Sequence, residues 1–241
     1  MPSTNVAVAL RNVRKDYRGL RPLRVEQLEL RQGESVALMG FDEVAAEVLV
    51  NLITGATLPD SGDVDVFGTP TGAITNPDAW LAAMDQFGIL GERTVLLEGF
   101  SVEQNLALPF SFELDEMPLT VRTTVRQLAD EVGIAPDQLP HAVAGLDAGA
   151  QLRVRLGKAL ALGPRVLRAQ HPNVALSRDQ LPRFAADRAA IAARRHLAMV
   201  VITADRAFAR AVSDRVLTLT PATGALTAAG GWRNWFARRV R

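Results

Sequence analysis

Two neighbouring carboxylates stand where the sequence changes from a strand pattern to a helix pattern. Residues 38–55 read LMGFDEVAAEVLVNLITG, in which an apolar run ends at Gly40 and a helix-like run ends at Gly55. A glycine turn between strand and helix can bind phosphate, because the first N–H groups of the helix point towards an anion. This turn instead holds Asp42 and Glu43 and has no lysine. We therefore expect a capped helix start in which carboxylates replace the phosphate, with a cation site as the alternative.

Other reactive residue types are sparse. The chain has no cysteine, which excludes disulfides, thiolate metal sites and cysteine nucleophiles. Its three histidines, His141, His171 and His196, lie too far apart in the sequence to indicate a metal cluster, so we expect no metal. The 27 basic and 26 acidic residues give a formal charge of +1. That balance does not indicate a nucleic-acid partner, and we expect none.

The sequence indicates a cytoplasmic protein. No apolar run approaches the roughly 20 residues that cross a bilayer, and the start, MPSTNVAVAL, lacks the pattern of a signal peptide. The last stretch, residues 230–241, reads GGWRNWFARRVR and is basic and aromatic. Such a tail suits an anionic membrane surface, which would make the protein peripheral on the inner face of the cell membrane. A solvated chain end is the alternative.

Strand patterns and helix patterns alternate at both ends of the 241-residue chain, whose 48% hydrophobic content is enough for a sizeable core. Alternation of this kind predicts a parallel sheet with both faces covered, and the helical middle predicts an inserted lobe. Strands are expected at 6–13, 24–30, 34–39, 63–67, 165–169, 197–203 and 215–219. Helices are expected at 44–53, 76–85, 101–108, 118–133, 147–162, 178–195 and 205–212.

Five stretches together resemble the ATP-binding subunit of an ABC transporter. They are LRNVRKDYRG, LPDSGDVDVFG, LLEGFSVEQNLALPF, QLRVRLGKALALGPRVL and AQHPNVAL, and the resemblance runs from about Val6 to Leu226. It implies an α/β fold of the P-loop NTPase (RecA-like) type with an N-terminal antiparallel β edge. It also implies one ABC-ATPase-like domain over 1–229, with a core at 1–90 and 163–229, a helical lobe at about 91–162, and the tail 230–241.

The phosphate loop departs from the family pattern at the positions that carry chemistry. The family ends this loop in Gly-Lys-Ser/Thr, where this chain has Ala45, Ala46 and Glu47. The substituted loop comprises Gly40, Phe41, Asp42, Glu43, Val44, Ala45, Ala46 and Glu47. Without the lysine, phosphate charge is uncompensated, and a carboxylate about 4 Å from it adds repulsion of roughly 4 kcal/mol at an effective dielectric near 20. We therefore expect no cofactor, with ATP and magnesium as the alternative.

The other family positions are also substituted. Gln170 replaces the magnesium-binding aspartate, His171 the catalytic glutamate, and Ala204 the switch histidine. His171 has a suitable ordinary pKa for a base, yet without magnesium or a held phosphate we interpret it as a hydrogen-bonded residue at a strand end. We expect no catalytic residue. Whether the chain is an enzyme stays open, with the substitutions favouring a protein that is not.

The signature of the family is degenerate as well. It reads Leu146, Asp147, Ala148, Gly149 and Ala150, and Asp147 is expected to cap the helix that follows. Because this chain has altered both halves of an ABC site, we do not expect it to complete a site on a partner. Tyr17 stands at the adenine-stacking position, with simple packing as the alternative. Glu92 stands at the glutamine loop, where the resemblance implies contact with a permease.

These features lead to one functional expectation. The chain is interpreted as an ABC ATP-binding-subunit-like protein without catalysis, a structural or regulatory subunit on a membrane permease. The resemblance also implies a homodimer, or a heterodimer with another ABC ATPase subunit. An ATP-binding ATPase with an altered loop and a soluble adaptor unrelated to transport are the alternatives.

Overall fold

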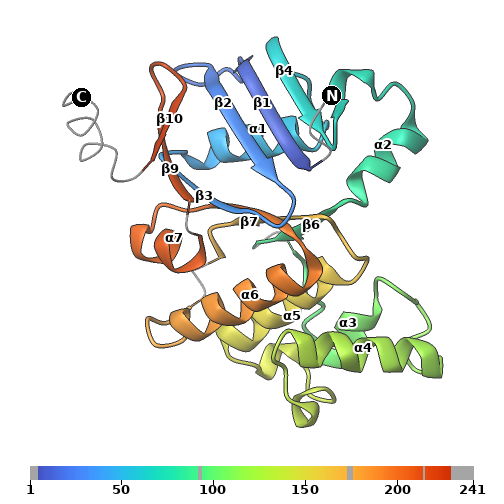
Figure 1. Ribbon diagram of the computed structural model, residues 1–241. Coiled ribbons are helices and arrows are strands. Elements are labelled where there is room, and N and C mark those ends of the chain that lie inside the picture. Colours follow the sequence, from blue (N-terminus) through green and yellow to red (C-terminus); the bar gives the residue numbers. More distant parts are fainter. Residues whose placement is uncertain (1–4, 92–93, 173–175, 214, 229–241) are drawn as a thin grey trace.

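Two β-sheets organise the molecule (Figure 1). The computed structural model describes residues 5–91, 94–172, 176–213 and 215–228. A four-stranded antiparallel sheet has the order β2-β1-β4-β5, and a six-stranded sheet has the order β10-β9-β3-β8-β7-β6. In the larger sheet every pairing is parallel except that of β10 with β9. The strands are β1 (Val6–Lys15), β2 (Leu23–Arg31), β3 (Ser35–Met39), β4 (Ser61–Val66), β5 (Thr69–Pro70), β6 (Phe87–Leu90), β7 (Val166–Gln170), β8 (Ala198–Ile202), β9 (Arg215–Thr220) and β10 (Ala225–Ala228).

Helices connect the parallel strands and form a layer against the larger sheet. Figure 1 shows α3 to α6 together below that sheet, and α1 between the strands of the two sheets. The α-helices are α1 (Glu43–Ile53), α2 (Pro77–Met84), α3 (Val102–Ala107), α4 (Leu119–Glu131), α5 (Ala148–Leu160), α6 (Leu181–Arg195) and α7 (Arg206–Val212). Short 3-10 turns lie at Thr71–Ala73, Pro136–Gln138 and Val143–Gly145.

Each face of the larger sheet contributes to a separate hydrophobic core. One core joins α1 to both sheets, with Leu49 and Leu52 packed among residues such as Leu10 and Val200. The other core joins the sheet to helices α3 to α7. Strand β8 is buried along its whole length and supplies alternate residues to the two cores. A strand covered on both faces reads as a continuous apolar run, as Ala198–Ile202 does.

Two sets of side-chain hydrogen bonds stabilise the chain around the start of α3. The fully buried Asn105 accepts a hydrogen bond from the Leu97 backbone N at 2.8 Å and donates to the Leu97 carbonyl at 2.9 Å. Ser101 forms a capping box with Gln104 at the start of α3. The capping box satisfies backbone N–H groups that the helix start would otherwise leave unpaired, and Asn105 satisfies backbone groups of the loop that precedes α3.

The fold class expected from the sequence is confirmed. The structure combines a P-loop NTPase-like parallel sheet with N-terminal antiparallel strands, and these strands form a sheet of their own. Each expected strand and helix is present, with ends that differ by three residues at most. The sequence reading missed β5, β6 and β10, each of four residues or fewer. The division into a core and a helical lobe stays a prediction, and the hydrophobic core beneath the sheet is continuous with helices α3 to α5.

Candidate functional site

In the turn between β3 and α1, a side chain of the turn itself caps the helix that follows. Asp42 is the N-cap of α1, and its Oδ1 accepts a hydrogen bond from the backbone N of Ala45 at 2.7 Å. The Asp42 carbonyl accepts a second bond, from Ala46 N at 2.9 Å. The helix start that would face an anion therefore already holds a carboxylate. The capped helix start predicted for Asp42 is confirmed, and Glu43 follows it as an exposed acidic residue in the first turn.

Ala46, predicted to stand at the lysine position of the phosphate loop, is part of the core. Ala46 is fully buried, Ala45 is buried beside it, and both pack with Phe41 against the sheets. Gly40, with φ of 82°, begins the turn, and a Cβ there would lie 2.8 Å from the Leu219 carbonyl. Val44 faces solvent, and Glu47 is half-buried in the next turn. The turn thus presents no cation where phosphate charge would collect.

A cavity of about 590 Å³ lies beside this turn. It is lined on one side by residues 17–24 and on the other by Gly40, Asp42, Val44 and Ala45. Tyr17 is half-buried there, and burial together with the nearby Asp42 charge raises the pKa of its phenol above the ordinary value. Tyr17 is also packed against the core that contains α1. Tyr17 therefore both packs against the core and lines the cavity. That its ring stacks on adenine stays a prediction.

The substituted strand-end positions gather near the same turn. Leu38 of β3 and Gln170 of β7 both pair with Ile202 of β8, so the ends of these three parallel strands lie at one edge of the sheet. His171 follows Gln170 with φ of 45°, and its backbone N donates to the Ile202 carbonyl at 2.9 Å. Ala204, two residues beyond β8, is exposed and has only a methyl side chain. The edge therefore holds an amide, an imidazole and a methyl group.

Residues 146–150, predicted to be a degenerate signature, lie at the start of α5, beside a second cavity of about 460 Å³. Asp147 caps α5 through a 2.8 Å bond from the Ala150 N, as the sequence predicts. A Cβ at Gly149 would lie 2.8 Å from Nε2 of Gln180, which leaves little room at this position. Arg153 donates to the Val132 carbonyl and to Asp187, each at 2.7 Å. Its guanidinium is therefore held by two partners within the chain, and it also lines this cavity.

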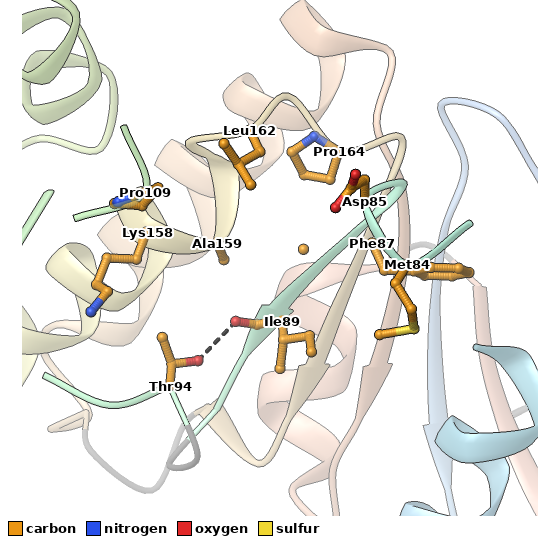
Figure 2. Close-up of a pocket in the computed structure, with 11 residues that line it drawn as sticks. Met84, Asp85, Phe87, Ile89, Thr94, Pro109, Lys158, Ala159, Leu162 and Pro164 are labelled. Atoms are coloured by element: carbon orange, nitrogen blue, oxygen red, sulfur yellow. Dashed lines mark hydrogen bonds between the residues drawn. The ribbon is translucent and has the colours of Figure 1, made fainter. Parts of the chain in front are cut away.

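An apolar groove of about 340 Å³ lies between β6 and the helical region (Figure 2). Ile89, Ala159 and Leu162 line it, and Lys158 lies at one end, where its Nζ donates to the Val95 carbonyl at 2.7 Å. Burial lowers the pKa of Lys158. Thr94 closes the lower side by donating to the Ile89 carbonyl at 2.8 Å. Glu92, the expected permease contact, and the tail 230–241 lie outside the described residues.

Comparisons with known proteins agree on one family. Over 220 residues the chain is 26% identical to the methionine import ATP-binding protein MetN of Brucella abortus, covering 90% of this chain and 58% of that protein. It is 30% identical to the phosphonates import ATP-binding protein PhnC of Anaeromyxobacter dehalogenans over 80% of this chain and 39% of that protein. The chain belongs to the ATP-binding cassette family. It spans less than two thirds of the length of these relatives, and no protein-family model matches it.

Solved cassettes share the fold at low sequence identity. CbiO1 from Clostridium perfringens, part of the ABC transporter complex cbiONQ, aligns with a TM-score of 0.82 at 18% identity, over 98% of this chain and 92% of that one. The cassette MJ0796, solved as a dimer bound to ADP and Pi, aligns with a TM-score of 0.74 at 21% identity, over 92% of this chain and 98% of that one. Within the described part of this cassette, no helix is long and apolar enough to cross a membrane.

The described residues at the predicted phosphate loop differ from the groups that bind a magnesium triphosphate in a P-loop. A P-loop holds the phosphates through backbone N–H groups and a lysine, and the metal through a hydroxyl and an acidic side chain. Here the Asp42 carboxylate occupies the helix start. The buried Ala46 stands where the resemblance implies the lysine, and Gln170 ends the strand where it implies the metal-binding acid. The described residues at these positions therefore do not fit magnesium triphosphate. The sequence reading overlooked Arg18, Arg21 and Arg24 beside Tyr17, although three arginines around Gly19 and Pro22 are visible in RGLRPLR.

Proposed function

We propose that this cassette is a non-hydrolysing subunit that attaches to a membrane permease and acts there as a structural or regulatory component. The observation that carries the proposal is the closed helix start, where Asp42 accepts the bond from Ala45 N that a phosphate oxygen would take. The relatives are import ATP-binding proteins, and the cassette fold is retained over nearly the whole chain. Because the cassette fold is retained while the phosphate-binding groups differ, these observations support a role that depends on the fold and not on ATP hydrolysis.

The groove beside β6 supports attachment to a partner. It is largely apolar, it borders the stretch that follows Glu92, and its upper rim is formed by Leu162, which is 62% exposed. Exposed apolar residues around a concave surface are typical of protein interfaces. On this proposal the protein is cytoplasmic and peripheral on the inner face of the membrane, as a homodimer or as a heterodimer with another ABC ATPase subunit.

Nucleotide chemistry is tested with the purified full chain. Calorimetric titration with ATP, with and without magnesium, is expected to show no magnesium-dependent binding at millimolar nucleotide, and phosphate release is expected to stay at the level of the buffer. Magnesium-dependent binding in the micromolar range, or turnover abolished by His171→Ala, would replace the proposal with an ATPase that uses an altered loop.

Attachment is tested by fractionating native cells that express the tagged chain. We expect the wild-type chain in the membrane fraction and Leu162→Arg in the supernatant, because the variant places a charge on the groove. Leu58→Arg is the matched control, since Leu58 is also an exposed leucine, at 49%, and lies outside the groove. A wild-type chain found only in the supernatant would support the soluble-adaptor alternative.

A further inference from the structure

Two large apolar side chains are exposed in the segment that joins α3 to α4. Phe112 is 90% exposed, and Leu119, the first residue of α4, is 78% exposed. The same segment buries Met117 and packs Leu114 against the core beneath the larger sheet, so it is folded onto the molecule. Because the residues between them are anchored in the core, Phe112 and Leu119 face solvent as part of the fold, and such apolar surface is typical of a binding site.

The exposed apolar side chains lie within an acidic stretch. Residues 94–121 include five acidic residues and no lysine or arginine. Three exposed carboxylates lie between the two apolar side chains, namely Glu113, Asp115 and Glu116. Within the described part of the chain, none of these three forms a salt bridge. Residues 111–119, here called the acidic-apolar segment, therefore combine apolar surface with uncompensated negative charge, which favours a partner that is basic and apolar.

Local contacts hold the acidic-apolar segment in place. The Ser111 hydroxyl accepts a hydrogen bond from the backbone N of Glu113 at 3.0 Å. Arg122, the first cation after the segment, lies with its Nε 3.7 Å from Glu103 of α3, so it joins α4 to α3. A segment that is already ordered avoids part of the entropic cost of binding a partner.

The chain itself contains a stretch with the complementary properties. The tail, residues 230–241, contains four arginines, three aromatic residues and no acidic residue. Arginine and tryptophan are the residue types that contribute most to protein interfaces, and guanidinium groups pair well with carboxylates. Both the charge and the apolar character of the tail therefore match those of the acidic-apolar segment.

The positions of the two elements favour binding between two copies of the chain. The strand before the tail, β10, is at one edge of the six-stranded sheet and β6 is at the other, and Figure 1 shows β10 and α4 on opposite sides of the molecule. Pro109, which precedes the acidic-apolar segment, lines the groove beside β6. The sheet is about 24 Å wide, so an extended chain needs about seven residues to cross it. Trp232 and Trp235 would be used in that crossing, whereas the tail of a second copy can bind with all its residues.

We propose that the acidic-apolar segment of one copy binds the tail of a second copy. Phe112 and Leu119 contact the aromatic side chains of the tail, and the three carboxylates pair with its arginines. The two copies contribute different surfaces, so the interface is heterologous and links copies head to tail into rings or open chains. This inference goes beyond the proposed function, because neither a permease nor a nucleotide takes part in the contact.

The first test is sedimentation velocity of the full chain over a range of concentrations, without nucleotide. We expect the mean sedimentation coefficient to rise with concentration, with a Kd on the order of 10 μM. Raising the salt from about 50 mM to about 500 mM is expected to weaken the association about tenfold, because exposed ion pairs are screened. A chain that stays monomeric at about 200 μM would overturn the proposal. The same holds if such a monomer binds anionic vesicles, which would assign the tail to a lipid surface.

Exposed substitutions locate the segment in the associating chain. Phe112→Ser with Leu119→Ser, and separately Glu113→Lys with Asp115→Lys, are each expected to weaken association at least about tenfold. The matched controls are Leu58→Ser, at another exposed leucine, and Glu26→Lys with Asp78→Lys, at exposed acidic positions elsewhere, and they are expected to leave association unchanged. Equal effects of the segment variants and the controls would place the interface elsewhere and overturn the proposal.

Mixing two defective variants tests the head-to-tail arrangement. Arg238→Glu with Arg239→Glu removes the tail contact, and Glu113→Lys with Asp115→Lys removes the segment contact. Neither variant is expected to associate alone, whereas their mixture is expected to form a 1:1 pair, because one copy keeps its tail and the other its segment. A mixture that stays monomeric would overturn the proposal. A monomeric chain that is still recovered in the membrane fraction of cells loses this inference and keeps the proposed function.

Discussion

The Asp42 carboxylate and the Ala45 backbone N lie 2.7 Å apart, so the helix that borders the phosphate-loop position is capped from within the chain. The side chain gives this helix start the negative partner that its N–H groups require. The same contact stabilises the fold and takes up the Ala45 N–H group at this helix start. Stability and the occupancy of the helix start are therefore linked through one residue.

Replacing Asp42 separates these two effects. Asp42→Ala removes the cap and is expected to lower the free energy of unfolding by about 1 kcal/mol, measured by urea denaturation. Asp42→Asn keeps a capping oxygen and removes the charge, so its stability is expected to stay within about 0.5 kcal/mol of wild type. An alanine variant as stable as wild type would show that the cap contributes nothing.

A lysine at position 46 is not expected to restore a phosphate loop. Ala46 is fully buried against both sheets, so Ala46→Lys overpacks the core and brings a charge into it. We expect a loss of about 3 kcal/mol in unfolding free energy and no magnesium-dependent ATP binding in calorimetry. The control is Val44→Lys, because Val44 is 55% exposed in the same helical turn. Micromolar ATP binding by Ala46→Lys would contradict the geometry described for the turn.

The buried amide of Asn105 is expected to be structurally essential. It bonds both backbone groups of Leu97, and it also donates to the Ser101 carbonyl at 3.1 Å. Asn105→Leu leaves the Leu97 N–H without an acceptor and removes one donor from each of the two carbonyls, which keep their backbone bonds from Phe100 N and from the N of residue 105. We therefore expect a loss of about 2–3 kcal/mol in unfolding free energy. Faster hydrogen exchange at residues 96–101 is the local signature of this loss. Gln127→Leu, at an exposed position of α4, is the control and is expected to have little effect.

Glu131 is expected to make stability depend on acid pH. Its hydrogen-bonded ion pair with Arg195 lowers the pKa of the carboxyl, against the opposing effect of burial, and Arg194 contributes further. Because the pKa is lower in the folded state, the stabilisation is complete above the unfolded pKa of about 4.3 and is lost as the pH falls towards the folded value.

The Glu131→Gln variant tests this dependence. At pH 7 we expect it to lose about 1–2 kcal/mol in unfolding free energy. Between about pH 5 and pH 3 its stability is expected to fall less steeply than that of wild type, measured by urea denaturation at each pH. Parallel curves for the two proteins would show that this carboxyl has the same pKa in the folded and unfolded states.

Local sequence patterns predicted the elements that are long and periodic. The helix that begins after Asp42 and the run Ala198–Ile202 carry clear helix and buried-strand signals, and both elements are present. Strand β6, Phe87–Leu90, was missed because four residues after a helix give too short a pattern, and its pairing with β7 depends on residues about 80 positions away. Propensity read along the chain cannot register such a partner.

The sequence allowed predictions about the residue types of the candidate site, but not about how these residues are arranged in space. The sequence predicted, through the resemblance, that Ala46 and Gln170 replace functional residue types, and this stays a prediction. It also predicted the helix cap at Asp42, which is present. It did not show that Ala46 is fully buried, or that Arg18 is held in a left-handed conformation beside Tyr17. Burial and cavity lining depend on how β1, β3 and α1 pack together, which no local pattern encodes.

Alternate residues of β8 face the two cores, and this alternation fixes the register of β8 in the larger sheet. Met199 and Val201 face one core, and Ala198, Val200 and Ile202 face the other, so a slip by one residue would exchange the two sets. Gln170, His171 and Ala204 belong to neither core. The side chains of these three residues thus lie outside the two hydrophobic cores that define the architecture. The side chains at these three positions can therefore change without loss of the scaffold that holds them.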